Sequence, residues 1–230
     1  KKIEEQEVVL LMDRFGYTRT VDVATYERNK EAADAESKYV VSCLNTGKVC
    51  IFTSTGKMHQ AKVLDLPYGN FRNKGTPIDN VCNYDSKVEN FLFIDSLENV
   101  MQNKVLFVTK QAMMKLVNGT EFVVSRKTSI STKLGDGDEI LKVLLVKDES
   151  DVVIQTKDDY FLRMEITDVP EKKKAALGVR GIKLANDDEV VDVHILDGEE
   201  DKSVKVKGNE VVLNRVRVGK RDTKGTKVRV

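Results

Sequence analysis

The stretch IFTSTGKMHQAKVLDLPYGNFRNKGTPIDNV, residues 51–81, decides the fold of this chain. An apolar strand that starts at Ile51 ends in Ser-Thr-Gly-Lys, where Gly56 can take a positive φ in a tight turn. A second strand, alternating apolar and polar residues, runs to Leu66, and Pro67 ends it because proline has no amide hydrogen to donate. The stretch therefore predicts a β-hairpin followed by a polar, basic loop.

The same unit, two strands joined by a tight turn with a basic residue on the second strand, can be found five times. The five hairpins span residues 8–23, 49–67, 104–122, 152–170 and 202–218. Their turns, at spacings of 40, 56, 46 and 50 residues, lie near Gly16, Gly56, Ala112, Asp158 and Gly208. A repeat of this length with several strands in each unit is typical of propeller-like arrays.

Two further segments recur between the hairpins. A basic cluster followed by glycine and an apolar strand occurs at 71–81 and 172–184, and acidic turns at 136–140 and 186–191 each lead into another strand. Each unit is therefore expected to hold about four strands: two in the hairpin, one after the basic loop and one after the acidic turn. That arrangement is a propeller blade.

Strand-forming residues recur throughout, which predicts an all-β chain. Only residues 25–38 have helix-forming composition, and there we expect a short turn of helix. We predict one domain over residues 1–230, with approximate blades at 8–48, 49–103, 104–151, 152–201 and 202–230.

The charge pattern is more informative than the net charge. The 230 residues carry 38 basic and 37 acidic side chains, a formal charge of +1, which does not by itself indicate nucleic-acid binding. Acidic clusters lie at 136–139, 147–151, 186–189 and 197–201, and basic clusters lie at 72–74, 125–127, 172–174 and 219–229. This segregation can build a surface with one positive edge, or it can serve solubility alone.

Cysteine and histidine do not indicate a metal or redox site. Cys43, Cys50 and Cys82 are an odd number without C-x-x-C spacing, which argues against a disulfide framework and a zinc site and favours a reducing cytoplasm. His59 and His194 lie 135 positions apart, and we expect both to be structural or merely exposed. No apolar run reaches the roughly 18 residues of a membrane span, and the lack of an initiator Met indicates a chain cut from a longer one.

Two other function classes have weaker support in the sequence. No nucleophile elbow, P-loop or metal-ligand cluster occurs, so we expect no catalysis and no cofactor or metal in this chain. The absence of tryptophan argues against a WD-type interaction propeller. A propeller-type protein–protein interaction module with no direct DNA contact stays as the alternative.

Four motifs in order resemble a known family. They are residues 51–81, LFVTKQAMMKLV at 106–117, VVIQTKDDYFLRMEITDVP at 152–170 and ALGVRGIKLANDDEVV at 176–191. They resemble the repeats of the C-terminal domain of the A subunit of bacterial type IIA topoisomerases, DNA gyrase and topoisomerase IV, over essentially the whole chain. The resemblance implies a β-pinwheel, an open or closed propeller relative in which neighbouring blades exchange strands and DNA wraps around a basic outer rim.

The resemblance also implies partners and a location. Double-stranded DNA would be bound without sequence specificity. The other partners would be an N-terminal breakage-reunion region of the same chain, which carries the catalytic tyrosine, and the separate ATPase (B) subunit. The parent would be an ATP-dependent DNA topoisomerase of the bacterial cytoplasm, associated with the nucleoid and not with a membrane. The fragment itself is expected to be monomeric.

DNA wrapping needs cations from successive blades, because phosphates supply sequence-independent affinity and the stiff duplex resists bending. The candidate DNA-binding residues are Arg19, Lys57, Lys62, Arg72, Lys74, Lys115, Arg126, Lys127, Arg163, Lys172, Lys173, Lys174, Arg180, Lys220, Arg221, Lys224 and Lys227. Those beside Gly75, Gly178 and Gly225 are preferred, because glycine there would let the backbone approach a phosphate. The preferred residues are Arg72, Lys74, Arg180, Lys220, Arg221 and Lys224.

One segment departs from the gyrase pattern. Gyrase A subunits resembling this chain carry a Gln-Arg-Arg-Gly-Gly-Lys-Gly type of heptapeptide in the loop after the first hairpin, tied to wrapping and negative supercoiling. Here the loop after Tyr26 reads ERNKEAADAES, with four acids and no glycine, and the nearest similar segment is GKRDTKGTK at 219–227. The departure favours a topoisomerase-IV-like role in decatenation or relaxation, and gyrase supercoiling stays open.

Overall fold

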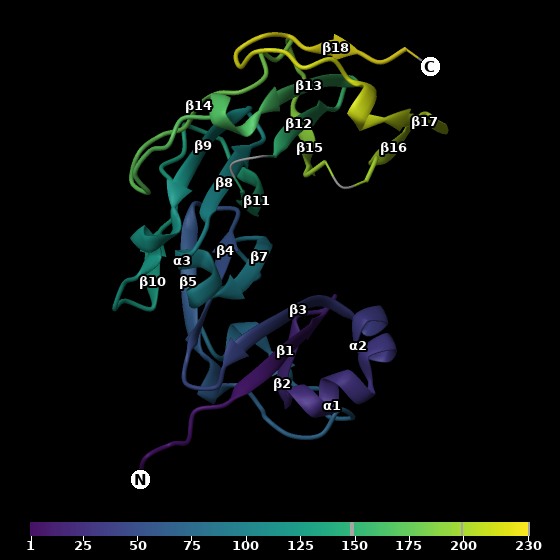
Figure 1. Cartoon of the computed structure of the whole chain (residues 1–230). Coiled ribbons are helices and arrows are strands. Elements are labelled where there is room, and N and C mark those ends of the chain that lie inside the picture. The colour runs from purple at the N-terminus through teal and green to yellow at the C-terminus, as the bar shows by residue number, and fades with distance from the viewer. Residues whose placement is uncertain (148–149, 199, 230) are drawn as a thin grey trace. The chain divides into compact units, whose positions relative to one another are not determined.

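The computed structural model describes residues 1–147, 150–198 and 200–229, and it confirms the all-β fold (Figure 1). Four four-stranded antiparallel sheets and one two-stranded sheet form within these residues. Contacts divide the chain into two compact units. Unit 1 comprises Lys1–Thr53, Lys57–Gln102 and Phe122–Ser129, and unit 2 comprises Ser54–Gly56, Asn103–Glu121 and Ile130–Val230.

The first sheet, in unit 1, has the strand order β3-β1-β2-β6. Its strands are β1 (Glu7–Asp13), β2 (Tyr17–Asp22), β3 (Ser37–Leu44) and β6 (Thr76–Pro77). The run from Val8 to Met12 in β1 is buried on both faces, because Val8, Leu10 and Met12 pack into one hydrophobic cluster and Val9 and Leu11 pack into another. A continuous apolar run therefore forms a central strand here.

The second sheet has the order β10-β5-β4-β7. Its strands are β4 (Lys48–Thr53), β5 (Lys57–Lys62), β7 (Phe91–Ser96) and β10 (Thr128–Ile130). The β4–β5 hairpin is the one that the stretch at 51–81 predicts, and Cys50 pairs with Gln60 in its register.

Unit 2 contains two further four-stranded sheets and the two-stranded sheet. The third sheet, β11-β8-β9-β14, is built from β8 (Lys104–Thr109), β9 (Met113–Asn118), β11 (Ile140–Val146) and β14 (Val179–Arg180). The fourth, β15-β12-β13-β18, is built from β12 (Asp151–Thr156), β13 (Tyr160–Glu165), β15 (Val190–Leu196) and β18 (Thr226–Lys227). The last hairpin forms only β16 (Ser203–Val206) and β17 (Asn209–Val212).

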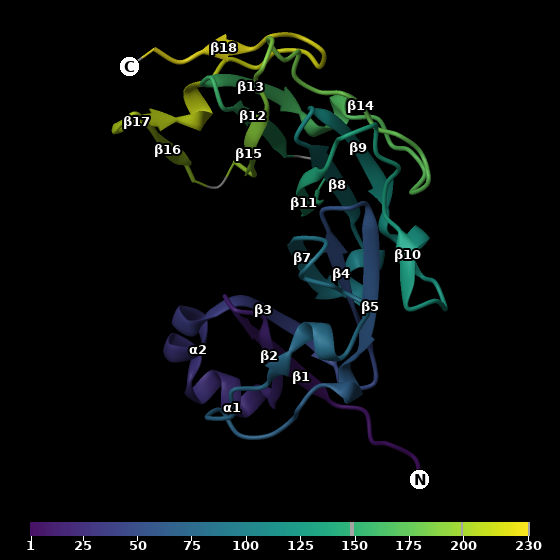
Figure 2. The same ribbon diagram turned by 180° about the vertical axis from the view of Figure 1, so that it is seen from behind.

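Strand exchange links consecutive repeats. The strand after each basic loop joins the hairpin of the preceding repeat and not the hairpin that it directly follows, so β14 lies beside β9 and β18 lies beside β13 in both views (Figures 1 and 2). The strand after each acidic turn joins its own hairpin, as in β11 with β8. The fourth strands thus cross the predicted blade boundaries, and each covers the edge of a hairpin strand that would otherwise stay unpaired.

All five hairpin turns place at least one residue in the left-handed region. These residues are Gly16, Gly56, Ala112, Asp159 and Gly208, with φ between +66° and +89°, and Lys207 beside Gly208 has φ of +49°. The turn predicted near Asp158 is therefore centred one residue later. Asp, unlike a β-branched residue, tolerates this conformation.

Each unit has its own hydrophobic core. In unit 1 the core includes Leu10, Ile51 and Ile94, and in unit 2 it includes Leu106 and Ile154, all at most 1% exposed. These residues come from the strands of the sheets, so the hairpins that define the repeat also carry most of this buried apolar surface.

Short helices flank the strands. The segment predicted to contain a turn of helix forms α1 (Val23–Arg28) and α2 (Lys30–Glu36), and α3 (Leu97–Met101) follows β7. The five 3₁₀ helices of the described residues are Val63–Asp65, Ile78–Asn80, Gly119–Phe122, Ile166–Asp168 and Leu213–Arg215. None of the helices in the described ranges is long and apolar enough to cross a membrane.

Candidate nucleic-acid interface

The basic loops of unit 2 are held by backbone hydrogen bonds to the hairpin of the preceding repeat. Lys172 N donates to the carbonyl oxygen of Leu116 at 2.8 Å, and Gly219 N donates to that of Arg163 at 2.7 Å. Each loop therefore runs along the second strand of a hairpin before its exchanged strand forms. The backbone hydrogen bonds of Lys172 and Gly219 thus attach each basic loop to the edge of a sheet.

Three glycines of the basic loops allow the exchanged strands to lie close to their partner strands. A Cβ atom at Gly75, Gly178 or Gly225 would lie 2.4–2.7 Å from the carbonyl oxygen of Thr18, Met114 or Phe161, respectively. Only glycine allows two backbones to come this close. The sequence suggested that these glycines let the backbone approach a phosphate. In the structure they let it approach the hairpin strand with which the exchanged strand pairs.

Consecutive basic loops also bond to each other. Asp222 N donates to the Gly181 carbonyl at 2.6 Å, and Lys183 N donates to the Thr223 carbonyl at 2.8 Å. The Arg221 guanidinium donates to the Arg180 carbonyl at 2.9 Å, and Arg180 forms an exposed ion pair with Asp222 at 3.4 Å. This geometry brings together four of the six preferred candidates, which we name the unit 2 basic edge: Arg180, Lys220, Arg221 and Lys224.

The unit 2 basic edge is open to solvent. Lys220 and Lys224 are exposed, more than half of the Arg180 side chain is exposed, and Arg221 is half-buried. A surface ion pair such as Arg180–Asp222 contributes little to stability. The cations of this edge therefore lie at the protein surface without a strong internal ion pair.

Lys115 has a structural position that the sequence did not reveal. Its side chain is fully buried, and Nζ donates to the carbonyl oxygens of Lys173, Lys174 and Ala176 at 2.8–3.1 Å. Burial lowers the pKa of this amine to about 8. Lys115 holds the lysine loop from the inside, so the structure removes it from the surface set of DNA contacts.

Arg163 is likewise occupied within the protein. Its guanidinium lies 2.8 Å from the Asp151 carboxylate and donates to the Asn214 carbonyl oxygen at 2.7 Å. About a fifth of its side chain is exposed. The structure therefore also removes Arg163 from the set of freely exposed cations.

Unit 1 contains a hollow of about 640 Å³ that we name the basic hollow. The cationic side chains that line it are Arg14, Arg19, Arg72 and Lys74, and its two carboxylates are Asp13 and Glu36. Phe15 and Phe71 supply aromatic surface. Arg72 and Lys74, the two preferred candidates of unit 1, are exposed and share this hollow.

Arg19 lies in the wall of the basic hollow and is only 8% exposed. It donates to the Phe71 carbonyl oxygen at 3.2 Å, and its guanidinium lies 5.3 Å from the Phe71 ring centroid. Its Nε atom has no hydrogen-bond partner in the described part of the chain. Arg19 is thus no outward-facing contact, and its charge is buried beside the hollow.

The remaining candidates are dispersed over both units. Gln60 in β5 holds the loop of Arg126 and Lys127. Its backbone N donates to the Lys127 carbonyl oxygen at 2.9 Å, and its side-chain amide donates to the Arg126 carbonyl oxygen. The exposed candidates outside the basic hollow and the unit 2 basic edge are Lys57, Lys62, Arg126, Lys127, Lys173 and Lys227. Lys172 and Lys174 are half-buried. These eight residues belong to neither of the two named surfaces.

The acidic turns act as caps for the hairpin turns. Asp138 Oδ1 accepts hydrogen bonds from Gln111 N at 3.0 Å and Glu139 N at 2.8 Å. Asp188 Oδ1 accepts from Asp158 N and Glu189 N in the same way, at 3.0 and 2.8 Å. These carboxylates satisfy backbone donors, as Asp side chains commonly do in turns.

Unit 1 contains a buried polar cluster around His59, and its other members, Glu89, Thr53 and Thr128, were not singled out in the sequence. His59 Nε2 lies 2.8 Å from Glu89 Oε2, and its Nδ1 lies 2.8 Å from the Thr128 hydroxyl, while Thr53 donates to Glu89 Oε1. His59 and Glu89 are almost completely buried. The structural role expected for His59 is confirmed, and His194 is half-buried beside the Gln155 side chain at 2.9 Å.

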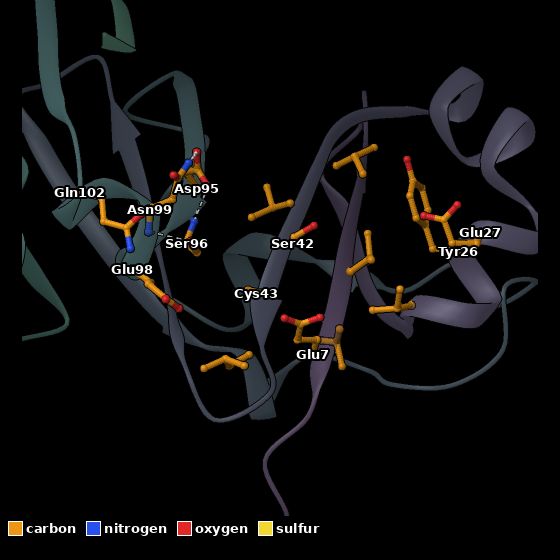
Figure 3. Close-up of a pocket in the computed structure, with 16 residues that line it drawn as sticks. Glu7, Tyr26, Glu27, Ser42, Cys43, Asp95, Ser96, Glu98, Asn99 and Gln102 are labelled. Carbon is orange, nitrogen blue, oxygen red and sulfur yellow. Dashed lines mark hydrogen bonds between the residues drawn. The ribbon is translucent and has the colours of Figure 1, made fainter. Parts of the chain in front are cut away.

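A second hollow in unit 1, of about 660 Å³, has the opposite charge (Figure 3). Four carboxylates line this acidic hollow, those of Glu7, Glu27, Asp95 and Glu98, and none of its described lining residues is a lysine or arginine. In Figure 3 Asp95 and Glu98 lie on one side of the strands that carry Glu7 and Ser42, and Glu27 lies on the other. Burial raises the pKa of Asp95. Such a surface repels phosphate.

A family model matches part of the chain. Residues 103–147 and 150–197 match the family described as the DNA gyrase C-terminal domain, beta-propeller. The gyrase A protein of Lawsonia intracellularis is 29% identical over 211 residues, which cover 86% of this chain and 26% of that protein. The gyrase A protein of Salmonella typhimurium is 28% identical over 86% of this chain and 24% of its own length. The chain thus spans about a quarter of these relatives.

Solved structures share the fold. The C-terminal domain of DNA topoisomerase IV superposes with a TM-score of 0.85 at 18% identity, covering 98% of this chain and 73% of the other. The E. coli ParC C-terminal domain gives 0.78 at 15% identity over 97% and 94% of the two chains. The DNA gyrase A C-terminal domain gives 0.65 at 16% identity over 96% and 76%. At these identities the likeness concerns the fold.

Proposed function

We propose that this chain is a C-terminal domain of the kind found in the A subunit of bacterial type IIA topoisomerases. We propose further that it binds duplex DNA without sequence preference and bends it along its basic loops. The unit 2 basic edge is the observation that carries this proposal. Two successive loops are joined there by Arg221 and Asp222, so their cations lie on one continuous backbone framework.

Phosphates are the ligand that this arrangement suits. Arg180, Lys220 and Lys224 are exposed cations on loops whose backbones are fixed, so little backbone conformational entropy is lost when they meet a rigid, evenly charged partner. The contacts would neutralise phosphates and release counterions, and they carry no base code. Bending a duplex by tens of degrees costs on the order of 1–6 kcal/mol, which contacts from several loops can offset.

A salt titration tests the proposal. The affinity of this chain for a duplex of about 40 base pairs is measured by anisotropy between about 50 and 300 mM salt, with a second duplex of unrelated sequence as control. The expected slope of log K against log salt is about −0.9 for each phosphate contacted and equal for both duplexes. A flat slope, or binding to one sequence only, would contradict the proposal.

Wrapping is tested by topology. Nicked circular DNA is sealed by ligase in the presence of the chain, and the linking number of the products is compared with that of DNA sealed alone. Wrapping predicts a shift of definite sign that grows with protein concentration. Unshifted products under conditions where anisotropy shows saturation would contradict wrapping and leave simple binding.

The segment between the first hairpin and β3 supports a topoisomerase-IV-like role. Residues 27–37, with four acids and no glycine, form parts of α1 and α2, and basic heptapeptide chemistry is absent from this described segment. We propose that the parent enzyme relaxes or decatenates DNA and does not introduce negative supercoils. Comparison of supercoiling and decatenation by the reconstituted parent enzyme tests this.

The holoenzyme context belongs to the same proposal. The chain would act without a cofactor of its own, beside the breakage-reunion region of its parent and a separate ATPase (B) protein, in the bacterial cytoplasm at the nucleoid. Its similarity to gyrase A proteins over about a quarter of their length supports this arrangement. Co-purification of the parent chain with DNA and with a B protein tests it.

The acidic hollow favours one alternative function, the binding of a protein partner. Val23 and Val40 line it with 39% and 38% exposure, and the four carboxylates complement a basic segment (Figure 3). In this alternative no DNA contact is made. A flat salt slope with DNA, together with binding to a basic peptide, would favour it over the DNA proposal.

A further inference from the structure

Phe15 is exposed to a degree that is unusual for a fixed aromatic residue. It is 70% exposed and lies in the turn of the first hairpin. Asp13 Oδ1 accepts hydrogen bonds from Phe15 N at 2.9 Å and Tyr17 N at 3.0 Å, and Gly16 N donates to the Asp13 carbonyl at 3.1 Å. The turn is therefore rigid, and it holds an apolar ring in water.

A cation stacks on this ring. The Arg14 guanidinium lies 4.7 Å from the Phe15 ring centroid, a cation–π arrangement that leaves the rest of the ring open. Arg14 is itself exposed. An aromatic plane beside an arginine is the surface on which proteins stack the bases of single-stranded nucleic acids.

The same turn borders a site for an anion. Phe15 and Arg14 line the basic hollow together with Arg72 and Lys74. Arg19 in its wall is 8% exposed, and within the described residues its Nε has no hydrogen-bond acceptor. A buried guanidinium with an unused donor is stabilised when a negative group occupies the adjoining space.

We infer that the basic hollow binds one unpaired nucleotide. The base stacks on Phe15, and the phosphate lies among Arg19, Arg72 and Lys74. The volume of about 640 Å³ is in the range of small-molecule sites and large enough for a nucleotide. Asp13 does not oppose the phosphate strongly, because backbone donors of the turn engage its carboxylate, and Glu36 is outnumbered by the four cations of the lining.

The occupant has to be unpaired because of what a duplex exposes. In a stacked duplex the faces of the bases are covered by their neighbours and only their edges reach the grooves. Away from the duplex ends, and without a kink that unstacks the base pairs, a ring such as Phe15 can stack only on a base that has left the helix. This inference rests on the proposed function, in which the basic loops, that of Arg72 and Lys74 included, hold the adjoining duplex.

The chain contains no tryptophan, and this gives a direct test. Phe15→Trp places a single reporter in the turn. We expect a single-stranded oligonucleotide of about eight thymidines to quench its fluorescence strongly, and a blunt duplex of the same length, at equal saturation by anisotropy, to leave it nearly unchanged. Equal quenching by both, or no quenching by the bound single strand, would overturn the inference.

Affinity provides the second measurement. Phe15→Ala should weaken single-strand binding roughly ten-fold by loss of one base–aromatic stack and leave duplex affinity within about two-fold. The matched control is Tyr68→Ala, which removes another exposed aromatic of unit 1, 54% exposed, that does not line the hollow. Its single-strand affinity should not change, and an equal loss in both variants would overturn the inference.

The two proposals fail separately. If the wild-type chain binds no duplex at any salt concentration, the proposed function fails. If duplex binding and its salt slope are as expected but Phe15→Ala binds single strands as well as wild type does, only the nucleotide site is lost.

Discussion

The Lys115 side chain donates a hydrogen bond of 2.8 Å to the backbone carbonyl oxygen of Lys173, so one lysine of this protein holds the loop that displays three others. The same amine also binds the carbonyl oxygens of Lys174 and Ala176. Lys115 was predicted from the sequence to contact DNA, but in the structure it is a buried residue that holds the backbone of the lysine loop in place.

Replacement of Lys115 by methionine should destabilise the fold. Three carbonyl oxygens would lose their buried donor, and an unsatisfied buried polar group costs about 1–3 kcal/mol. Urea denaturation of the wild type and the variant measures the change. Lys173→Met, which removes an exposed amine from the same loop, is the control and should leave the midpoint almost unchanged.

The lowered pKa of Lys115 predicts a pH dependence. The pKa of the amine is about 8 in the fold and near its ordinary 10.5 in the unfolded chain, so between these values the unfolded state binds more protons. Stability contributed by this group therefore rises with pH across that window. The free energy of unfolding of the wild type minus that of Lys115→Met should increase from about pH 8 to pH 10. A constant or falling difference would show that the pKa is not lowered.

The exchanged strands predict an effect at glycine. Gly225→Ala places a Cβ 2.4 Å from the Phe161 carbonyl oxygen at a φ of +70°, and we expect a loss of more than about 1–3 kcal/mol, the cost of the backbone strain alone. Gly208→Ala is the matched control, because its φ is +83° and its Cβ would meet no atom within 4 Å. Thermal unfolding compares the two. Equal losses would mean that the close approach of the backbones contributes nothing.

Neutralisation of the exposed cations of the basic hollow should weaken DNA binding evenly. Arg72→Ala with Lys74→Ala removes two phosphate contacts, so the salt slope should become shallower by about 1.8 for every duplex sequence. The control variant, Lys205→Ala with Lys207→Ala, removes two exposed lysines of unit 2 that lie outside the candidate surfaces. Selective loss of one sequence would instead indicate base readout.

The buried pair of His59 and Glu89 should matter for folding and not for DNA. Their side chains are each 3% exposed and 2.8 Å apart, and Glu89→Ala would leave Nε2 of the imidazole without the carboxylate that it contacts. An unsatisfied buried polar group costs about 1–3 kcal/mol. Chemical denaturation measures the loss, and the salt slope of DNA binding, measured under conditions where the variant is folded, should stay the same.

The hairpins could be predicted from the sequence because their signals are local. Gly56 marks a positive-φ turn between alternating strands, and the structure has that turn with φ of +82°. The partner of the strand after each basic loop could not be predicted, because Thr226 pairs with Phe161, a residue far away in the chain. Strand identity depends on nearby residues, whereas strand pairing depends on tertiary contacts.

The candidate site shows the same division. Lys224 and Lys115 are the same residue type and both were predicted to contact DNA, yet one is exposed and the other is fully buried. Burial depends on which loop covers the side chain, and neither spacing nor composition reports that. Phe15 could have been identified from the sequence, since an aromatic residue in the centre of a polar turn has no core to pack against.

The exchange of strands has a consequence for synthesis on the ribosome. The first sheet receives β6 (Thr76–Pro77) only after the whole second hairpin has been translated, so an earlier sheet always waits for part of a later one. Nascent chains of this protein should therefore expose an incomplete sheet edge for as long as elongation continues. Removal of the last segment, with β18, would leave the fourth sheet permanently in that state.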